Sequence, residues 1–258
     1  MIEKREPLRP TPPGRGLKYG MGFFETILVT DGKPRFLPEH LNRLIESCRF
    51  IGLRAPNLYR HILDEIASLP INDNNTISIT VSETPEGYSL LVSSEMRNRN
   101  PYSLLGLKVT TVPQIRDKNN PLNRHKSCNY LLNHLVHARV KEAGFDEALF
   151  LNQDGNVTEG TFTNFFFIKG KEIITPPPSQ GLLPGIFRAQ VITALEQAGL
   201  PVDERPISYS RELSTMDAAF VTNSLIPLER IFSIDGRRFA PANDTFNRVL
   251  EATASIRE

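Results

Sequence analysis

Lys126 is the residue of this chain whose surroundings most directly suggest chemistry. It lies in the segment Arg124-His125-Lys126-Ser127-Cys128-Asn129-Tyr130-Leu131, just ahead of a stretch with helical periodicity. Cationic neighbours can lower the pKa of a lysine, which makes its amine a usable nucleophile and base. Most lysines are solvated surface charges, so the interpretation depends on what accompanies this one.

A lone carboxylate, Glu159, follows in the segment Thr158-Glu159-Gly160-Thr161-Phe162-Thr163-Asn164. These residues are mostly small, and they lead into an apolar strand. A lysine that forms a Schiff base with pyridoxal phosphate (PLP) works beside an acid that pairs with the pyridine nitrogen. Lys126 and Glu159 therefore form a candidate pair for this chemistry.

Three further segments could bind a phosphate group. Leu183-Pro184-Gly185-Ile186-Phe187-Arg188 combines a glycine with a helix start, where free amides and the helix dipole favour anions. Thr222-Asn223-Ser224 directly follows a strand, and Arg43 lies on a helix and has the paired donors of a guanidinium. Each segment also has a reading without a ligand. Residues 183–188 could be an ordinary loop-to-helix junction, residues 222–224 a capped turn, and Arg43 a solvated surface arginine.

The composition restricts the class of protein. The 258 residues suffice for one large domain or two smaller ones, with 40% hydrophobic and 23% charged residues. A net charge of +1 gives no support for binding nucleic acid or an acidic membrane, and no apolar stretch predicts a signal peptide or a membrane span. Two cysteines predict no disulfide framework, which favours a cytoplasmic protein. His134 and His137 are three apart on a helix but have no third ligand, so no metal is expected.

The order of the predicted elements favours an α+β fold, because strands and helices mix without strict βαβ alternation. Helices are expected at about 38–51, 58–69, 130–143, 185–198 and from 241, and strands at 23–30, 76–81, 88–93, 107–112, 148–151, 165–168, 202–207, 218–222 and 231–234. In the helix at 130–143, three leucines (Leu131, Leu132 and Leu135) are expected to face inward. A polar run flanked by prolines predicts a linker at 114–122 between domains at 1–113 and 123–258.

Seven short motifs in order, from about Tyr19 to Ile234, resemble the fold-type IV (class IV) family of PLP-dependent enzymes. They are Tyr19-Gly20-Met21-Gly22-Phe23-Phe24-Glu25-Thr26, His40-Leu41-Asn42-Arg43-Leu44, Lys126-Ser127-Cys128-Asn129-Tyr130-Leu131, Asp146-Glu147-Ala148-Leu149-Phe150-Leu151, Gly155-Asn156-Val157-Thr158-Glu159-Gly160-Thr161, Leu183-Pro184-Gly185-Ile186-Phe187-Arg188 and Val221-Thr222-Asn223-Ser224. The resemblance implies a small N-terminal α/β domain, a larger C-terminal domain with a mixed, barrel-like sheet, PLP between them, and a homodimer whose partner subunit contributes to the site.

The resemblance also implies roles for individual residues. Lys126 would carry the cofactor and shuttle protons, and Glu159 would pair with the pyridine nitrogen. The cofactor phosphate would be bound by Arg43, by the amides of Ile186 and Phe187, and by Asn223 with Ser224.

Within the family, the motifs around Thr26, Lys126 and Thr222 look more like the 4-amino-4-deoxychorismate lyases, in which a threonine matching Thr26 assists proton transfer. Such a lyase releases pyruvate and 4-aminobenzoate, a folate precursor. The alternatives are an aminotransferase for D-amino or branched-chain amino acids, and a non-catalytic homologue that binds or scaffolds.

Three departures from the family pattern bear on this choice. The usual first strand is absent or replaced by a proline-rich arm, and the turn Gly20-Met21-Gly22 lacks its acid. The loop Ser82–Tyr88 has no arginine where relatives commonly have Arg-Gly. If that arginine binds the substrate carboxylate in relatives, Arg97, Arg99 or Arg116 must replace it here, or the substrate differs.

Overall fold

The computed structural model describes residues 14–73, 75–96, 106–240 and 243–256. Its helices are α1 (Arg15–Tyr19), α2 (Leu37–Phe50), α3 (Leu58–Ser68), α4 (Leu131–Glu142), α5 (Ile186–Gln197), α6 (Tyr209–Glu212) and α7 (Asp244–Ala252). Its strands are β1 (Gly22–Thr30), β2 (Lys33–Pro34), β3 (Asn75–Thr84), β4 (Gly87–Met96), β5 (Leu107–Ile115), β6 (Glu147–Leu151), β7 (Asn164–Lys169), β8 (Glu172–Thr175), β9 (Val202–Glu204), β10 (Ala218–Thr222), β11 (Glu229–Ile234) and β12 (Arg237–Arg238). The expected α+β fold is confirmed.

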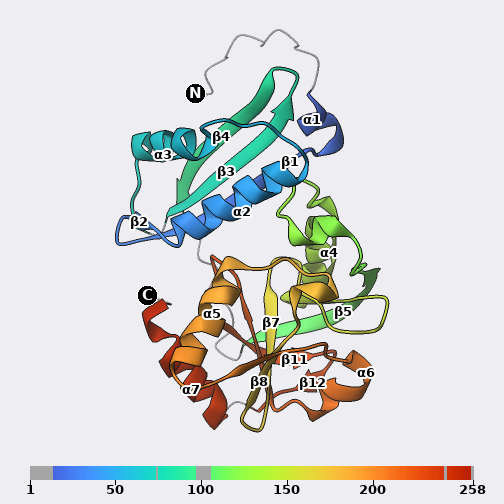
Figure 1. Cartoon of the computed structure of the whole chain (residues 1–258). Helices are drawn as coiled ribbons and strands as arrows, with labels where there is room; N and C mark the ends of the chain where they lie inside the picture. Colours follow the sequence, from blue (N-terminus) through green and yellow to red (C-terminus); the bar gives the residue numbers. More distant parts are fainter. Residues whose placement is uncertain (1–13, 74, 97–105, 241–242, 257–258) are drawn as a thin grey trace.

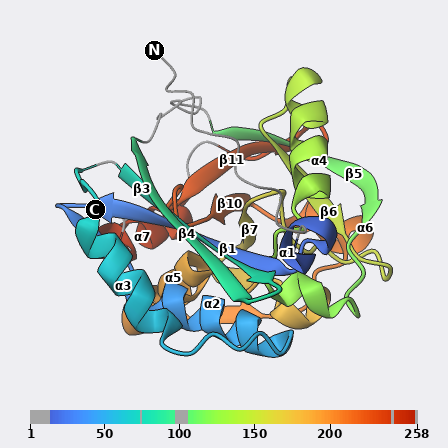
Figure 2. The same ribbon diagram turned by 90° about the horizontal axis from the view of Figure 1, so that it is seen from above.

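The N-terminal sheet has the strand order β2-β1-β3-β4, and α2 and α3 cover one of its faces (Figures 1 and 2). Alternation along β1 sends Phe23, Ile27 and Val29 into the core beneath these helices. Glu25 has the same parity, so its carboxylate is also buried under α2, whereas Phe24 and Thr26 face the other way. This alternation determines which β1 side chains can reach the cavity.

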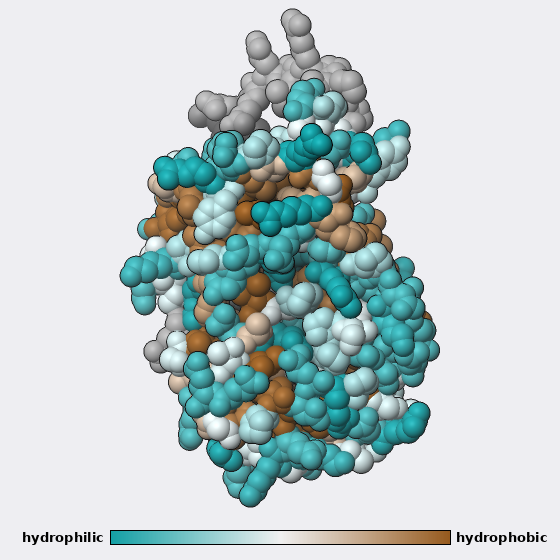
Figure 3. Space-filling model, viewed as in Figure 1, coloured by the Kyte–Doolittle hydropathy of each residue, from teal (hydrophilic) through white to brown (hydrophobic). Residues whose placement is uncertain are grey.

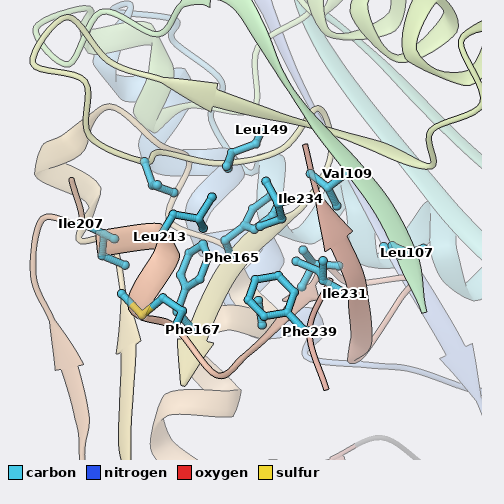
Figure 4. Close-up of a cluster of buried hydrophobic side chains, with 14 of the residues drawn as sticks. Leu107, Val109, Leu149, Phe165, Phe167, Ile207, Leu213, Ile231, Ile234 and Phe239 are labelled. Atoms are coloured by element: carbon cyan, nitrogen blue, oxygen red, sulfur yellow. The ribbon is translucent and has the colours of Figure 1, made fainter. Parts of the chain in front are cut away.

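The second sheet has the order β6-β5-β11-β10-β7-β8-β9, with β12 paired to β11, and it mixes parallel and antiparallel neighbours. The run Phe165-Phe166-Phe167 on β7 alternates between two cores. Phe165 and Phe167 pack in the cluster drawn in Figure 4, on the face opposite α5 and α7. Phe166 packs instead against residues of α5 and α7. The middle of this sheet is therefore buried on both faces.

The chain passes from the first sheet to the second between β4 and β5. β5 pairs in parallel with both β6 and β11, so residues 107–111, which lie inside the N-terminal domain predicted at 1–113, pair within the second sheet. The passage thus comes before the linker predicted at 114–122. The 3-10 turn Pro121–Arg124 then leads to Lys126.

Helix α4 departs from its expected orientation. Val136 and Val140 pack against β6, but the side chains of Leu131, Leu132 and Leu135 are 70%, 46% and 48% exposed. The expected inward position of these leucines is therefore wrong for the single chain, because α4 contacts the sheet only through its valine face. Apolar side chains also reach the surface in patches on the face of the molecule shown in Figure 3.

Several predicted turns have the backbone that their residues favour. Asp31-Gly32 and Asp235-Gly236 both have positive φ, as a two-residue hairpin turn requires. Sequence reasoning missed five short or weakly patterned α-helices and strands: α1, β2, β8, α6 and β12. Helix α1 lies in the region predicted to be an irregular arm, of which residues 1–13 are outside the described part of the chain.

Candidate active site

Lys126 is attached to the N-terminal sheet although its sequence neighbours continue into α4. The Phe24 amide donates to the Lys126 carbonyl at 2.9 Å, and the Cys128 amide donates to the Gly22 carbonyl at 2.9 Å. Residues 126–128 thereby pair with the start of β1. The His125 ring, stacked on Phe50 with centroids 4.3 Å apart, fixes the preceding residue against α2.

A single cavity collects most of the predicted site. Thr26, Arg43, Lys126, Ile186, Phe187, Asn223 and Ser224 all line it, together with Phe24, Tyr130, His134, Phe162, Asn164, Leu183, Gly185 and Leu225. The predicted site residues among them come from β1, α2, the segment before α4, the start of α5 and the loop after β10. The structure therefore brings together every predicted site residue except Glu159.

The Lys126 amine lies in an apolar environment, with Nζ 4.2 Å from the centroid of the Phe24 ring and 4.8 Å from that of Tyr130. Burial lowers the pKa of Lys126 to about 8; Arg43 adds to this shift, and Glu25 and Glu159 oppose it. The lowered pKa was predicted from the basic sequence neighbours, but its main physical cause is desolvation. In the described part of the chain the amine has no hydrogen-bond or ion-pair partner, so it is free to react.

Arg43 is oriented by Glu25. Its Nε and Nη2 donate to the two carboxylate oxygens of Glu25, each at 2.7 Å, and its Nη1 donates to the Pro184 carbonyl at 3.0 Å. Burial alone would raise the pKa of Glu25, but Arg43 and His40 lower it to about 2. Arg43 is therefore a fixed cation at the cavity wall, with donors left over for a ligand.

The start of α5 presents free amides to the same cavity. The first turn begins at Gly185, whose carbonyl accepts from the Ala189 amide, and the amides of Ile186 and Phe187 have no acceptor in the described residues. A side chain at Gly185 would be blocked, because a Cβ there would lie 2.1 Å from Oδ1 of Asn164. Glycine thus permits the close packing that places these amides at the cavity.

Asn223 and Ser224 have different surroundings. The Asn223 side chain accepts from the amides of Leu225 and Ile226 and donates to the Phe162 carbonyl, so it builds the turn. The phosphate contact predicted for Asn223 stays a prediction. The Ser224 hydroxyl remains next to the cavity, 3.3 Å from Nε2 of His40. The buried hydroxyl of Thr222 has no hydrogen-bond partner among the described residues.

Glu159 lies beside the cavity and not in its lining. It borders an adjoining hollow with Arg116 and Tyr130, and Tyr130 is shared by the two spaces. Its Oε1 lies 3.1 Å from Nη2 of Arg116, and its Oε2 accepts from the Leu183 amide at 2.9 Å. Burial raises the pKa of Glu159, and the charge of Arg116 opposes that shift.

Arg116 was one of three arginines proposed to bind a substrate carboxylate. Its ion pair with Glu159 gives it another task, namely balancing the charge of that buried acid. The other two, Arg97 and Arg99, lie outside the described residues.

Sequence reasoning missed the roles of Glu25, His40 and Tyr130, although all three stand inside the motifs. Alternation along β1 would have placed Glu25 on the covered face, where a buried acid requires a cation. The histidines considered as metal ligands pack their rings on Phe162, with centroids 5.0 Å (His134) and 5.1 Å (His137) away. No group of three or more potential metal ligands occurs among the residues that the structure describes.

Comparison with known proteins agrees with this geometry. The family model for amino-transferase class IV matches residues 22–234. A Methanocaldococcus jannaschii protein named "Putative branched-chain-amino-acid aminotransferase" is 32% identical over 86% of this chain and 81% of its own. The aminodeoxychorismate lyase of Bacillus subtilis is 29% identical over 87% and 82% of the two chains.

Solved structures show the same similarity. A Legionella pneumophila protein described as a "Putative 4-amino-4-deoxychorismate lyase" superimposes with a TM-score of 0.86 at 28% identity, covering 98% of this chain and 97% of the other. The branched-chain aminotransferase of Escherichia coli, at 22% identity and a TM-score of 0.80 over 94% and 87% of the two chains, has the same fold. No helix in the described ranges is long and apolar enough to cross a membrane. This chain is a member of the class IV aminotransferase family, with fold type IV and PLP as its cofactor.

Proposed function

We propose that this protein is a 4-amino-4-deoxychorismate lyase that releases pyruvate and forms 4-aminobenzoate, a folate precursor. The observation that carries the proposal is that the Thr26 side chain lines the same cavity as the Lys126 amine. Lyase chemistry needs a proton to be removed from one position and delivered to another. An amine and a hydroxyl in one apolar cavity provide two groups for that task.

The residues of the cavity fit PLP. Free amides at the start of α5, the Ser224 hydroxyl and the cation of Arg43 suit its phosphate. The unpaired amine of Lys126 suits its aldehyde. The Glu159 carboxylate has lone pairs beyond the two already used, and one of them could accept the pyridine N–H.

When bound, PLP supplies an electron sink for the substrate carbon that loses its proton. The protein performs the proton transfers and the positioning. With a pKa of about 8, Lys126 loses its proton more readily than an ordinary lysine, and the neutral amine can take up a proton. Thr26 can hold or pass on that proton, and the ring of Phe162 helps to exclude water.

A homodimer is part of this proposal. The exposed leucines of α4 (Leu131, Leu132 and Leu135) form an apolar surface at the helix that directly follows Lys126 and Tyr130. A second copy of the chain on this surface would remove the leucines from water and border the hollow lined by Leu122 and Leu132. We further propose a cytoplasmic location, where the free thiols of Cys48 and Cys128 would persist.

The alternative is an aminotransferase for branched-chain or D-amino acids. The names of the Methanocaldococcus jannaschii relative and of the Bacillus licheniformis D-alanine aminotransferase, 26% identical over 86% of this chain, favour it. The two functions differ in their products. Purified enzyme should form pyruvate and 4-aminobenzoate from 4-amino-4-deoxychorismate, whereas glutamate formation from 2-oxoglutarate and an amino donor as the only activity would contradict the lyase proposal.

Thr26 provides a second test. Thr26→Val keeps the shape of the side chain but removes the hydroxyl, so we expect kcat of the lyase reaction to fall about 10²-fold while PLP still attaches to Lys126. Thr30→Val, at the far end of β1, is the matched control and should retain activity. An unchanged kcat in Thr26→Val would remove Thr26 from the proton-transfer path.

A further inference from the structure

Glu147 is a buried acid that lines neither the cavity nor the adjoining hollow. It is the first residue of β6 and only 3% exposed. Among the described residues no arginine or lysine forms an ion pair with it, and the basic group that approaches it, Nδ1 of His137, lies 3.9 Å from its Oε1. Burying a carboxylate is costly unless hydrogen bonds compensate it. The groups that compensate Glu147 therefore indicate what it does.

Apart from the amide of Ala148, the donors to this carboxylate come from one short segment. Oε1 of Glu147 accepts from the amide of Thr161 at 2.9 Å and also from its hydroxyl. Oε2 accepts from the Thr163 hydroxyl at 3.0 Å and from the Phe162 amide at 3.4 Å. Burial alone would raise the pKa of Glu147, but hydrogen bonds, including those from Thr161, lower it. The ionised carboxylate therefore accepts on both oxygens and satisfies these donors.

The backbone of this segment folds around the carboxylate. The Gly160 amide donates to the Thr163 carbonyl at 2.7 Å, which closes a turn. A Cβ at Gly160 would lie 2.8 Å from Cδ of Glu147, so the close approach requires glycine. On the outer side, Nδ2 of Asn133 on α4 donates to the Thr161 carbonyl at 2.6 Å. The turn is thus held by a carboxylate from within and by an amide of α4 from outside.

This turn carries part of the cavity wall. The ring of Phe162 lines the cavity and stacks near the ring of Tyr130, with centroids 6.3 Å apart and an interplanar angle of 19°. The Phe162 carbonyl accepts from Nδ2 of Asn223 at 3.1 Å, in the loop that also carries Ser224. Displacing the turn would therefore shift both an aromatic side chain of the cavity and the loop next to the proposed phosphate site.

We propose that the Glu147 carboxylate is the template for the turn at 160–163 and thereby a positioning residue for the bound cofactor. By holding the turn, it fixes the Phe162 ring in the cavity wall and, through the Phe162 carbonyl, orients the loop of Asn223. It acts through these groups and touches neither cofactor nor substrate. The inference rests on the proposed place of PLP in the cavity.

Two substitutions of Glu147 test this role. Glu147→Leu keeps a similar volume but removes both acceptor oxygens, so the amides of Thr161 and Phe162 lose their partner. Glu147→Gln keeps one acceptor oxygen, disturbs the fold less and should show the same changes to a smaller extent. Glu212→Leu is the matched control, because Oε1 of Glu212 also accepts from a backbone amide, that of Ser208 at 3.0 Å, and Glu212 does not line the cavity.

Amide hydrogen exchange in the cofactor-free protein measures the turn directly. In Glu147→Leu we expect exchange at Thr161 and Phe162 to become about 10-fold faster or more, because local opening no longer breaks these hydrogen bonds, while the amides of β7 and β10 exchange as in wild type. In Glu212→Leu the turn should exchange as in wild type. Equal acceleration throughout the second sheet would show that Glu147 only supports the fold, and it would overturn the positioning role.

PLP binding measures the effect on the cofactor site. In Glu147→Leu we expect the lysine-bound cofactor band to form with a Kd about 10-fold higher than in wild type, because the hydrogen bonds to a charged group that hold the turn are gone. The visible circular dichroism of that band, which reports the asymmetric surroundings of the cofactor, should weaken as well. Glu212→Leu should match wild type in both. A loosened turn with unchanged Kd and circular dichroism would overturn the inference.

Failure of this inference differs from failure of the proposed function. Wild-type exchange and a wild-type Kd in Glu147→Leu would overturn the inference alone. A wild-type protein that captures PLP but forms no 4-aminobenzoate from 4-amino-4-deoxychorismate would contradict the lyase proposal and leave the role of Glu147 intact. A wild-type protein that captures no PLP would overturn both.

Discussion

At the scale of single residues, the site depends on buried charges that balance one another. Burial makes the Lys126 amine a weaker base. The carboxylate of Glu25 forms an ion pair with Arg43, and that of Glu159 forms one with Arg116. Removing one partner from such a pair leaves an uncompensated buried charge, and this lowers the free energy of unfolding much more than replacing both partners by apolar residues would.

The pH dependence of cofactor capture follows from the pKa of Lys126. The folded-state value of about 8 lies below the usual value of roughly 10.4, so the neutral, nucleophilic amine accumulates as pH rises through 8. We expect the rate at which the cofactor-free protein captures PLP to rise with pH and to level off above about 8. Stopped-flow absorbance checks this, and a rate that keeps rising to about pH 10 would indicate an ordinary, solvated lysine.

The same shift affects stability. Between about 8 and 10.4 the unfolded chain binds more protons at Lys126 than the folded protein does. This residue therefore makes the free energy of unfolding of the cofactor-free protein rise with pH in that window. Urea titrations of wild type and Lys126→Met isolate the contribution, because the variant should lose this part of the slope; equal slopes would contradict the assignment.

At the scale of elements, the site depends on strand alternation and on one helix start. The alternation of side chains along β1 could be predicted, and it places Glu25 and Thr26 on opposite faces of the sheet. Pattern alone could not show that residues 126–128 pair with β1, because that contact joins segments about a hundred residues apart. The ion pair between Arg116 and Glu159 could not be predicted either, since nothing in the motifs relates these two residues.

The start of α5 gives a prediction at this scale. Gly185→Ala would place a Cβ against Oδ1 of Asn164, so we expect a loss of about 1–3 kcal/mol in the free energy of unfolding and weaker PLP binding. In an Asn164→Ala background the same substitution should cost less, because the obstructing amide is gone. Urea unfolding of the four proteins in this double-mutant cycle checks the contact, and additive effects would show that it is not the cause.

At the scale of the whole molecule, the fold class and the family could be predicted from the sequence, because seven different motifs occur in the order typical of the family. The exposed leucines of α4 were misassigned for a physical reason: helical periodicity reports an apolar face but not what covers it. A face predicted to pack on this chain's own core instead reaches the surface, where we propose that a second copy covers it.

That proposal predicts the state of association. Leu135→Asp places a charge in the apolar surface of α4, so we expect sedimentation to show a monomer where the wild type is a dimer. Leu91→Asp on β4 is the matched control, since Leu91 is 64% exposed and lies away from α4. A wild-type protein that is already monomeric would refute the dimer directly.

The most direct test of the central claim is to locate the covalent attachment of PLP. Cofactor-free protein is loaded with PLP, reduced with borohydride and digested, and the modified peptide is identified by mass spectrometry. The adduct should lie on Lys126 and be absent in Lys126→Met, while Lys141→Met, which changes a surface lysine paired with Asp146, should be labelled like wild type. An adduct on another lysine, or none at all, would contradict the assignment of Lys126 as the residue that carries the cofactor.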